Sequence, residues 1–198
     1  NQNYLGISHS TDGWRNLAQD EYLLNTLPQD ALALFFYVNA RAVIIGRNQN
    51  PWAECNLSAM QKDQVQLVRR VSGGGAVYHD AGNLNFSFIC SAARYDEQAQ
   101  TDLILRALRH LGIDAQQTGR NDIACDGQKF SGNAFAVRAN NRQRHGTLLI
   151  DTQLDAMGRY LNVSAAKLRA KGVKSVRARV CNLRRFCPEL TVEKMYDA

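Results

Sequence analysis

The sequence predicts an α+β fold, in which helices and largely antiparallel strands follow one another without the strict alternation of a doubly wound parallel sheet. Three observations support this. Apolar residues near the N-terminus recur at helical spacing, residues 83–88 alternate between polar and apolar, and Asp126-Gly127 stands between two strand-like runs. With three prolines, no internal repeat and no linker-like stretch, we expect one continuous domain.

The first element is an amphipathic helix over residues 12–27, which Pro28 closes. Its apolar positions are Trp14, Leu17, Ala18, Tyr22 and Leu24. Two β-rich runs follow at residues 32–38 and 42–46, and the polar residues 39–41 between them suggest a hairpin. The pattern then predicts a short helix over residues 54–63 and a strand over residues 65–70.

The middle of the chain continues with a strand at residues 76–79 and a second strand at residues 83–88. In the second, the polar side chains alternate with Leu84, Phe86 and Phe88, as expected for one buried face and one face in water. A helix over residues 102–111, capped by Gly112, follows.

The segment at residues 122–131 predicts a tight hairpin, because Asp-Gly is a strong signal for a two-residue turn. Pairing outward from the turn places Cys125 opposite Gln128, Ala124 opposite Lys129, Ile123 opposite Phe130 and Asp122 opposite Ser131. Side chains alternate between faces, so Lys129 and Asp122 share one face. An ordinary exposed ion pair is one explanation of that proximity.

Composition narrows the class of protein. Hydrophobic residues make up 45% of the 198, which suits a packed core. The apolar run at residues 31–38 is far shorter than the roughly 18 residues of a membrane span, and the polar start does not resemble a signal peptide. The five cysteines are an odd number and form no CxxC pair, so we expect neither disulfides nor a zinc site. The expected location is the cytoplasm.

The positive charge is concentrated in residues 159–188, which contain nine Lys or Arg and no acid. The rest of the chain then has fifteen basic against eighteen acidic residues. Such a segment suits a nucleic acid, a phosphate-bearing ligand or an acidic protein, and it is also compatible with a solvated face that has no partner.

Three consecutive glycines follow the basic pair at residues 69–70. Gly73, Gly74 and Gly75 allow close approach of the backbone to an anion, with guanidinium charge beside it. The spacing matches neither the Walker nor the dinucleotide-binding pattern, so a flexible turn remains an alternative to a phosphate site.

The stretch at residues 69–80, Arg-Arg-Val-Ser-Gly-Gly-Gly-Ala-Val-Tyr-His-Asp, followed by Gly82-Asn83, resembles the lipoate-protein ligases of the biotin and lipoate ligase superfamily. The resemblance runs from about residue 14 to residue 183. Further matching segments are residues 45–52, 54–56, 119–123, 129–134, 145–149 and 171–180. One departure is Arg144-His145, where the family usually has two histidines.

The resemblance implies a fold of mixed, largely antiparallel sheets flanked by helices. It also implies that residues 1–198 are the catalytic large domain, incomplete at its C-terminus and without the accessory domain. Lys129 would be the catalytic residue, and Asp122 would bind Mg²⁺. The implied contacts to ATP and the adenylate are Arg70, Ser72, Gly74, Gly75, Ala76, Val77, Tyr78, Asn121, Asp122, Lys129 and Ala134. The implied contacts to lipoate are Arg70, Gly75, His79, Lys129 and His145.

The activity implied by the resemblance is lipoate salvage. ATP and Mg²⁺ would convert lipoate to lipoyl-AMP, and the lipoyl group would pass to a lysine of an apo lipoyl domain. Expected carriers are the acyltransferase subunits of 2-oxoacid dehydrogenase complexes and the glycine-cleavage H protein, whose acidic surfaces the basic segment would attract. No nucleic acid or membrane partner is expected.

Three alternatives stay open at this point. The first is a lipoyltransferase that uses preformed lipoyl-AMP. The second is an octanoyltransferase, which would need a cysteine nucleophile. The third is a nucleic-acid-binding module built on the basic segment.

Overall fold

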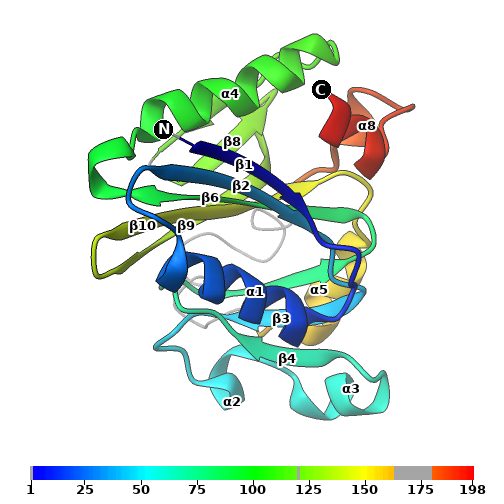
Figure 1. The fold of residues 1–198 in the computed structure, drawn as a ribbon. Coiled ribbons are helices and arrows are strands. Elements are labelled where there is room, and N and C mark those ends of the chain that lie inside the picture. The colour runs from blue at the N-terminus through cyan, green and yellow to red at the C-terminus, as the bar shows by residue number, and fades with distance from the viewer. Residues whose placement is uncertain (1, 120, 163–179) are drawn as a thin grey trace.

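A computed structural model describes residues 2–119, 121–162 and 180–198, and their strands form two β-sheets (Figure 1). The seven-stranded sheet has the order β1-β2-β6-β10-β9-β8-β7, and the three-stranded sheet has the order β4-β3-β5. The strands of the larger sheet are β1 (Gln2–Ile7), β2 (Ala31–Tyr37), β6 (Asn83–Ser91), β7 (Gln116–Thr118), β8 (Asp122–Cys125), β9 (Gln128–Arg138) and β10 (Asn141–Leu149). Those of the smaller sheet are β3 (Arg41–Ile45), β4 (Gln66–Arg69) and β5 (Ala76–Asp80).

Helices lie on both faces of the larger sheet (Figure 1). The described α-helices are α1 (Gly13–Thr26), α2 (Pro51–Glu54), α3 (Leu57–Lys62), α4 (Glu97–His110), α5 (Leu154–Tyr160) and α8 (Val192–Asp197), with 3-10 turns at Ala92–Arg94 and Leu183–Arg185. Helix α1 contacts strands of both sheets, whereas α4 and α8 cover the opposite face of the larger sheet. None of these described helices has the length and apolar character required to cross a bilayer.

The predicted α+β class is confirmed, since every described strand pair except β1–β2 and β3–β4 is antiparallel. Helix α1 matches the helix expected at residues 12–27, and the Asp12 side chain caps it by accepting from the backbone N–H of Arg15. The helix expected at residues 54–63 is shorter in the structure and corresponds to α3, which Asn56 caps. A separate helix, α2, precedes it, ends at Glu54 and is capped by Asn50.

The predicted hairpin between residues 32–38 and 42–46 is wrong. Strand β2 pairs with β1 and β6 in the larger sheet, whereas β3 pairs with β4 and β5 in the smaller one. The connection turns inward: Asn39 is fully buried and its side chain bonds to Asn16 and His79. Asn39 and its buried hydrogen bonds thus stabilise the connection between β2 of the larger sheet and β3 of the smaller sheet.

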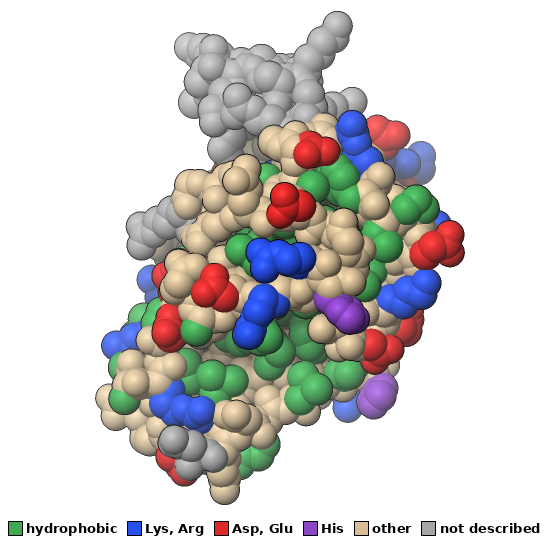
Figure 2. Space-filling view, turned by 90° about the horizontal axis from the view of Figure 1, so that it is seen from above, with side chains coloured by type: hydrophobic (Ala, Val, Ile, Leu, Met, Phe, Trp, Pro, Cys, Tyr) green, Lys and Arg blue, Asp and Glu red, His purple; other side chains and the backbone are tan. Residues whose placement is uncertain are grey.

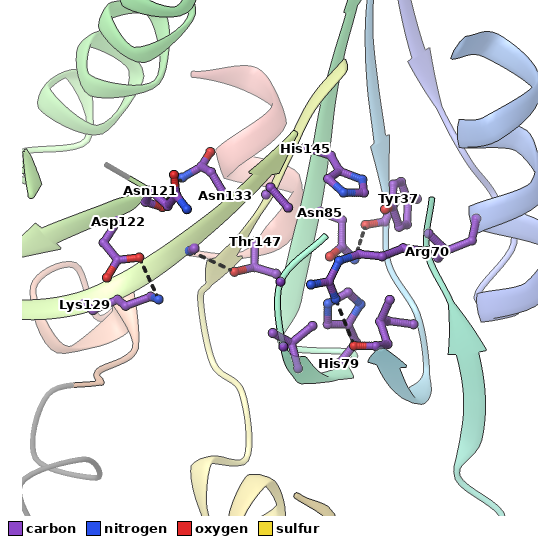
Figure 3. Close-up of a pocket in the computed structure, with 18 residues that line it drawn as sticks. Tyr37, Arg70, His79, Asn85, Asn121, Asp122, Lys129, Asn133, His145 and Thr147 are labelled. Atoms are coloured by element: carbon purple, nitrogen blue, oxygen red, sulfur yellow. Dashed lines mark hydrogen bonds and ion pairs between the residues drawn. The ribbon is translucent and has the colours of Figure 1, made fainter. Parts of the chain in front are cut away.

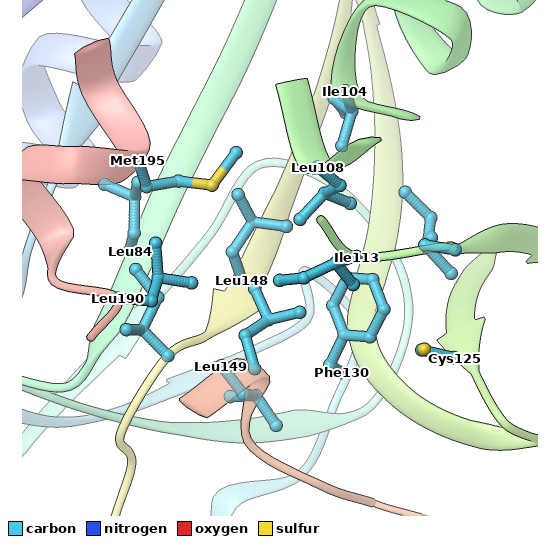
Figure 4. Close-up of a cluster of buried hydrophobic side chains, with 14 of the residues drawn as sticks. Leu84, Ile104, Leu108, Ile113, Cys125, Phe130, Leu148, Leu149, Leu190 and Met195 are labelled. Carbon is cyan, nitrogen blue, oxygen red and sulfur yellow. The ribbon is translucent and has the colours of Figure 1, made fainter. Parts of the chain in front are cut away.

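Strand β6 alternates as predicted, but its polar face is not solvated. Asn83, Asn85 and Ser87 are at most 1% exposed. On the other side of the sheet, a hydrophobic cluster packs under α4 (Figure 4) and includes Leu84, Ile104, Leu108, Phe130 and Leu148. The polar face is buried because α1 and the smaller sheet lie over that side of the larger sheet.

The β8–β9 hairpin follows the predicted register only next to its turn. Cys125 pairs with Gln128 and Ala124 with Lys129, but a bulge then places Ile123 opposite Ser131 and Asp122 opposite Gly132. The predicted pairs of Ile123 with Phe130 and of Asp122 with Ser131 are therefore wrong. Phe130 is the extra residue on the bulged strand, and its ring is fully buried in the hydrophobic cluster.

Candidate functional site

A cavity of about 240 Å³ lies between the two sheets, with α1 at one side (Figure 3). Its lining comes from both sheets, from α1 and from the glycine-rich loop, which we define as residues 70–75. The residues are Leu17, Tyr37, Ile44, Arg70, Gly74, Gly75, Val77, His79, Asn85, Asn121, Asp122, Lys129, Gly132, Asn133, Ala134, His145, Gly146 and Thr147.

Most of the site residues expected from the sequence line this one cavity. They are Arg70, Gly74, Gly75, Val77, His79, Asn121, Asp122, Lys129, Ala134 and His145. Ser72, Ala76 and Tyr78 do not line it. Strand β5 alternates, so Val77 and His79 face the cavity while Tyr78 packs on the far side against Tyr160, with ring centroids 5.3 Å apart. Ala76 and Tyr78 thus lie outside the lining of the cavity, and their expected contacts to ATP stay predictions.

The guanidinium of Arg70 organises the glycine-rich loop. Its Nε donates to Ser72 Oγ (3.0 Å) and to the Gly73 carbonyl (3.1 Å), and its Nη2 donates to the same carbonyl at 2.7 Å. Nη1 donates to the carbonyl of Ile44 at 3.1 Å. A guanidinium has five N–H groups, so two remain for a ligand beyond the partners in the described residues.

The loop can hold Arg70 in this way because residue 74 is a glycine. Gly74 has φ +94°, and a Cβ there would lie 2.7 Å from Arg70 Nη2. Burial lowers the pKa of Arg70 to about 10, which still leaves the side chain charged at neutral pH. The loop therefore presents a permanent cation to the cavity.

His79 adds a neutral polar group to the same cavity. Burial, followed by the charges of Arg70 and His145, lowers the pKa of His79 to about 3. The Asn39 amide lies 3.0 Å from His79 Nδ1. Because Asn39 Nδ2 can only donate, Nδ1 accepts and the proton of the neutral ring resides on Nε2. This buried Nε2 has no partner among the described residues.

His145 lies at the centre of a buried chain of polar groups. Its Nδ1 is 3.0 Å from Asp20 Oδ2, and its Nε2 is 2.6 Å from Ser72 Oγ. The order of groups resembles a Ser-His-Asp triad, but Ser72 is 1% exposed, lies outside the cavity lining and already accepts a bond from Arg70. Ser72 is thus not placed to attack a ligand. Its side chain contacts Arg70 and His145, and its expected contact to ATP stays a prediction.

Lys129 and Asp122 lie at the other side of the cavity and form an ion pair of 2.8 Å. Each side chain is 41% exposed, so the pair opens toward solvent. Asn133 anchors the neighbouring backbone, since its backbone N–H and its Nδ2 both donate to the Asn121 carbonyl. Val180, the last residue of the family-like stretch at residues 171–180, forms a β-bridge with Lys129. Residues 171–179 of this stretch lie outside the described residues.

Sequence reasoning missed part of the lining, namely Leu17, Tyr37, Ile44, Asn85, Gly132, Asn133, Gly146 and Thr147. The sequence could have indicated Asn85, because it belongs to the polar face of β6. It could also have indicated Gly132 and Asn133, which lie inside the segment that resembles the family's lysine motif. No sequence pattern distinguishes Leu17, Tyr37 and Ile44 from ordinary buried apolar residues.

Arg144, the departure from the expected histidine pair, has a structural role. It is 2% exposed, and its Nη1 donates to Thr101 Oγ1 (2.7 Å) and to the Glu97 carbonyl (3.0 Å). Its Nε donates to Asn133 Oδ1 at 3.1 Å. Arg144 therefore ties α4 to the sheet, while the adjacent His145 faces the cavity.

The carboxylates of residues 2–119, 121–162 and 180–198 do not form a preassembled metal centre. Within the described residues there is no group of three or more His, Cys, Asp or Glu side chains that could hold an ion. Asp122 is the one carboxylate among the lining residues. Mg²⁺ commonly binds through one or two carboxylates together with substrate phosphates, so Asp122 suits an ion that arrives with a nucleotide.

Residues 12–198 match the family described as the lipoyl protein ligase A/B catalytic domain. The chain belongs to this family. A lipoate-protein ligase A from Psychrobacter cryohalolentis is 47% identical over 188 residues, which are 95% of this chain and 56% of that relative. The chain thus spans little more than half the length of that curated relative.

Solved structures of the family share the fold. One is described as a bi-partite lipoate protein ligase and its E2 lipoyl domain from Thermoplasma acidophilum. It is 33% identical with a TM-score of 0.88, over 99% of this chain and 80% of that one. Another, described as lipoate-protein ligase A bound with ATP, is 30% identical with a TM-score of 0.86, over 99% of this chain and 81% of that one.

Proposed function

We propose that this chain activates lipoate with ATP and transfers the lipoyl group to a lysine of a lipoyl domain. The observation that carries the proposal is one cavity that contains the Arg70 loop, an apolar wall and the Lys129–Asp122 pair. A relative bound with ATP and a relative studied with its lipoyl domain support both halves of the reaction.

The cavity suits a ligand that is apolar at one end and anionic at the other. Leu17, Ile44 and Val77 provide an apolar wall for the acyl chain. Arg70 is a charged donor that is already held in place, and Lys129 provides a second cation at the open side. We therefore assign lipoate to the inner part of the cavity and the nucleotide phosphates to the space between Arg70 and Lys129.

In the first step, a carboxylate oxygen of lipoate attacks the α-phosphorus of ATP. A carboxylate–phosphorus bond forms, the bond from the α-phosphorus to the bridging oxygen breaks, and pyrophosphate leaves. Both reactants are anions, so the chief task of the protein is to hold them together against repulsion. We assign this task to Arg70, to Lys129 and to the N–H groups of the glycine-rich loop.

In the second step, the lysine amine of the carrier attacks the carbonyl carbon of lipoyl-AMP. An amide bond forms, the bond to AMP breaks, and the amine gives up a proton to the medium. Negative charge grows on the carbonyl oxygen during the attack. Lys129 is the catalytic residue in this proposal, because its ammonium can stabilise that charge as it did the charge on phosphate.

Mg²⁺ is proposed to accompany the nucleotide and to bind at Asp122, the lining carboxylate. When bound, the ion neutralises charge on the leaving pyrophosphate. Asp122 also pairs with Lys129 at 2.8 Å, so the residue that would hold the ion lies beside the ammonium that would face the phosphate.

For carriers, we propose the lipoyl domains of 2-oxoacid dehydrogenase complexes and the glycine-cleavage H protein, with the reaction serving lipoate salvage. Arg184 and Arg185 carry basic charge in the described residues beyond Val180 and are exposed. Acidic carriers would be attracted to such charge. A carrier domain without acidic residues near its lysine should then be modified more slowly at low salt.

The test is to incubate the chain with ATP, Mg²⁺, lipoate and an apo lipoyl domain, and to look for a lipoyl adduct by mass spectrometry. Pyrophosphate release is measured in parallel. An adduct from preformed lipoyl-AMP, without pyrophosphate release from ATP and lipoate, would identify a transferase and contradict the adenylation step. Octanoate in place of lipoate measures the acyl preference.

A cysteine-based octanoyl transfer has little support in the cavity. None of the five cysteines lines it. Burial raises the pKa of the Cys55, Cys90, Cys125 and Cys181 thiols, which disfavours the reactive thiolate. Retention of activity after alkylation of the accessible thiols would agree with the adenylate route.

A further inference from the structure

Asp20 is a buried carboxylate that the proposed reaction does not use. It lies on α1, is 1% exposed and is not part of the cavity lining. A buried charge is costly unless it is paired and hydrogen-bonded. The partner of Asp20 is His145, whose Nδ1 is 3.0 Å from Asp20 Oδ2.

The bonds that continue from His145 lead to the glycine-rich loop. A guanidinium can only donate, so Arg70 Nε–H donates to Ser72 Oγ at 3.0 Å. A carboxylate can only accept, so His145 Nδ1–H donates to Asp20. The other ring nitrogen, Nε2, lies 2.6 Å from the same Ser72 Oγ. A continuous chain of hydrogen bonds therefore links Arg70 to Asp20 through Ser72 and His145.

The far end of this chain fixes the shape of the glycine-rich loop. Arg70 holds the Gly73 carbonyl with two of its nitrogens, and Gly74 packs against the guanidinium so closely that a Cβ would meet Nη2 at 2.7 Å. A rotation of the guanidinium would therefore break contacts with both glycines. Ser72 accepts from the Nε side and so restricts such a rotation.

Both ends of the chain of hydrogen bonds are buried. Arg70 and Asp20 are at most 8% exposed, and Ser72 and His145 between them are buried polar side chains (Figure 3 shows Arg70, His145 and Tyr37). The phenol of Tyr37 also lies near Asp20, and burial followed by the charge of Asp20 raises the pKa of Tyr37. Loss of the Asp20 carboxylate would leave His145 Nδ1 without its buried acceptor.

We propose that Asp20 is a positioning residue, which sets Arg70 and the glycine-rich loop through His145 and Ser72 without touching a ligand. The inference rests on the proposed function in one respect, namely that Arg70 and the loop bind the nucleotide. It joins residues from α1, β10 and the loop, which are far apart in the sequence.

The first experiment is a double-mutant cycle on ATP affinity, with Asp20→Asn, Ser72→Ala and the double variant. Misplacement of a positioned group by about 1 Å can reduce activity roughly 100-fold, so we expect each single variant to bind ATP about 10- to 100-fold more weakly. Because both substitutions break the same chain of hydrogen bonds, the double variant should bind ATP no more weakly than the single variant of lower affinity. Losses that multiply in the double variant would contradict the inference.

The matched control is Glu21→Gln, which removes an exposed carboxylate one residue along the same helix. It should leave ATP affinity within about twofold of the unmodified chain, as expected for surface charges of small effect. Equal losses in Glu21→Gln and Asp20→Asn would point to the net charge of α1 and overturn the positioning role.

The second experiment needs no ligand and so separates this inference from the proposed function. Exchange of the Arg70 Nε proton with solvent is followed by NMR in the unmodified chain and in Asp20→Asn. The two proteins are compared at temperatures equally far below their melting temperatures. Faster exchange at Arg70, without direct contact between residues 20 and 70, is the expected result. Unchanged exchange would overturn the inference, even if the chain makes lipoyl-AMP.

One outcome is that the protein makes no lipoyl-AMP while exchange of the Arg70 Nε proton still accelerates in Asp20→Asn. This result would contradict the proposed function and support the positioning role of Asp20. Asp20→Ser replaces Asp20→Asn if the latter does not fold. It also removes the charge and should accelerate Arg70 exchange, and unchanged exchange in Asp20→Ser would overturn the inference in the same way.

Discussion

Lys129 and Asp122 stand on neighbouring strands of one hairpin, with Nζ and Oδ1 2.8 Å apart at the open side of the cavity. Asp122 lies two residues from Ala124, the cross-strand partner of Lys129. The two side chains therefore share a face even though a bulge shifts the register beyond Ala124. The pair holds the Lys129 ammonium at the cavity.

Replacement of Lys129 by alanine should reduce lipoyl transfer by at least about 100-fold, because removal of one donor to a developing oxyanion has that effect. The fold should be little affected. Lys129 is 41% exposed, and an ion pair of this kind contributes at most about 1 kcal/mol. Transfer rates and thermal melts measure both effects. Lys62→Ala, which removes an exposed lysine on α3, is the control and should keep full activity.

Gly74→Ala should destabilise the loop that holds Arg70. Alanine is strained at φ +94°, and its Cβ would meet Arg70 Nη2 at 2.7 Å. Strain of this kind costs about 1–3 kcal/mol, so we expect a lower free energy of unfolding and weaker ATP binding. Gly73→Ala is the matched control for stability, because a Cβ at Gly73 meets no atom within 4 Å. Equal destabilisation by the two variants would contradict this role of Gly74.

His79 should make the protein less stable as the pH falls. Its folded pKa of about 3 lies below the usual value of 6.5, so the unfolded state binds more protons between these values. The free energy of unfolding then decreases as pH falls through this window, by at most about 1.4 kcal/mol per pH unit from this group. Above pH 6.5 the contribution is constant.

Urea denaturation between pH 6.5 and pH 4 checks the His79 prediction. His79→Gln cannot titrate, so its stability should fall less steeply with pH than that of the unmodified chain. His110→Gln, which removes an exposed histidine on α4, is the matched control. A slope that is the same in all three proteins would show that His79 is not held neutral.

Arg144→Met should destabilise the attachment of α4 to the larger sheet. The variant leaves Thr101 Oγ1, the Glu97 carbonyl and Asn133 Oδ1 without their buried donor. Loss of one partner of a buried hydrogen bond costs about 1–3 kcal/mol, and we expect a decrease of that size in the free energy of unfolding. Arg142→Met is the control, since Arg142 is only half-buried and should change stability by less than about 1 kcal/mol.

Much of the fold was predictable from local pattern. The helix at α1, the alternation of β6 and the Asp126-Gly127 turn depend on spacing and turn chemistry, which are properties of short segments. The shared face of Asp122 and Lys129 followed from the same reasoning. These features were predictable because each depends only on one helix, one strand or two neighbouring strands.

Features that depend on how the sheets pack were not predictable. The sequence at residues 39–41 predicts a hairpin. In the structure, the Asn39 side chain points inward, because it forms hydrogen bonds with the side chains of His79 and Asn16. The register of β9 also changed, because Phe130 is buried as the extra residue of a bulge. Local pattern contains no information about such distant partners.

The sequence by itself determined the α+β class, most of the elements and, through its resemblance to a family, ten of the 18 described residues that line one cavity. Only the tertiary structure decided that the polar face of β6 is buried, that Tyr78 faces away from the cavity, and that Asp20, Ser72 and His145 form one chain of bonds. The reason is physical. Which face of a strand meets water depends on what covers it, and a hydrogen bond between residues 125 positions apart exists only once the sheets have packed.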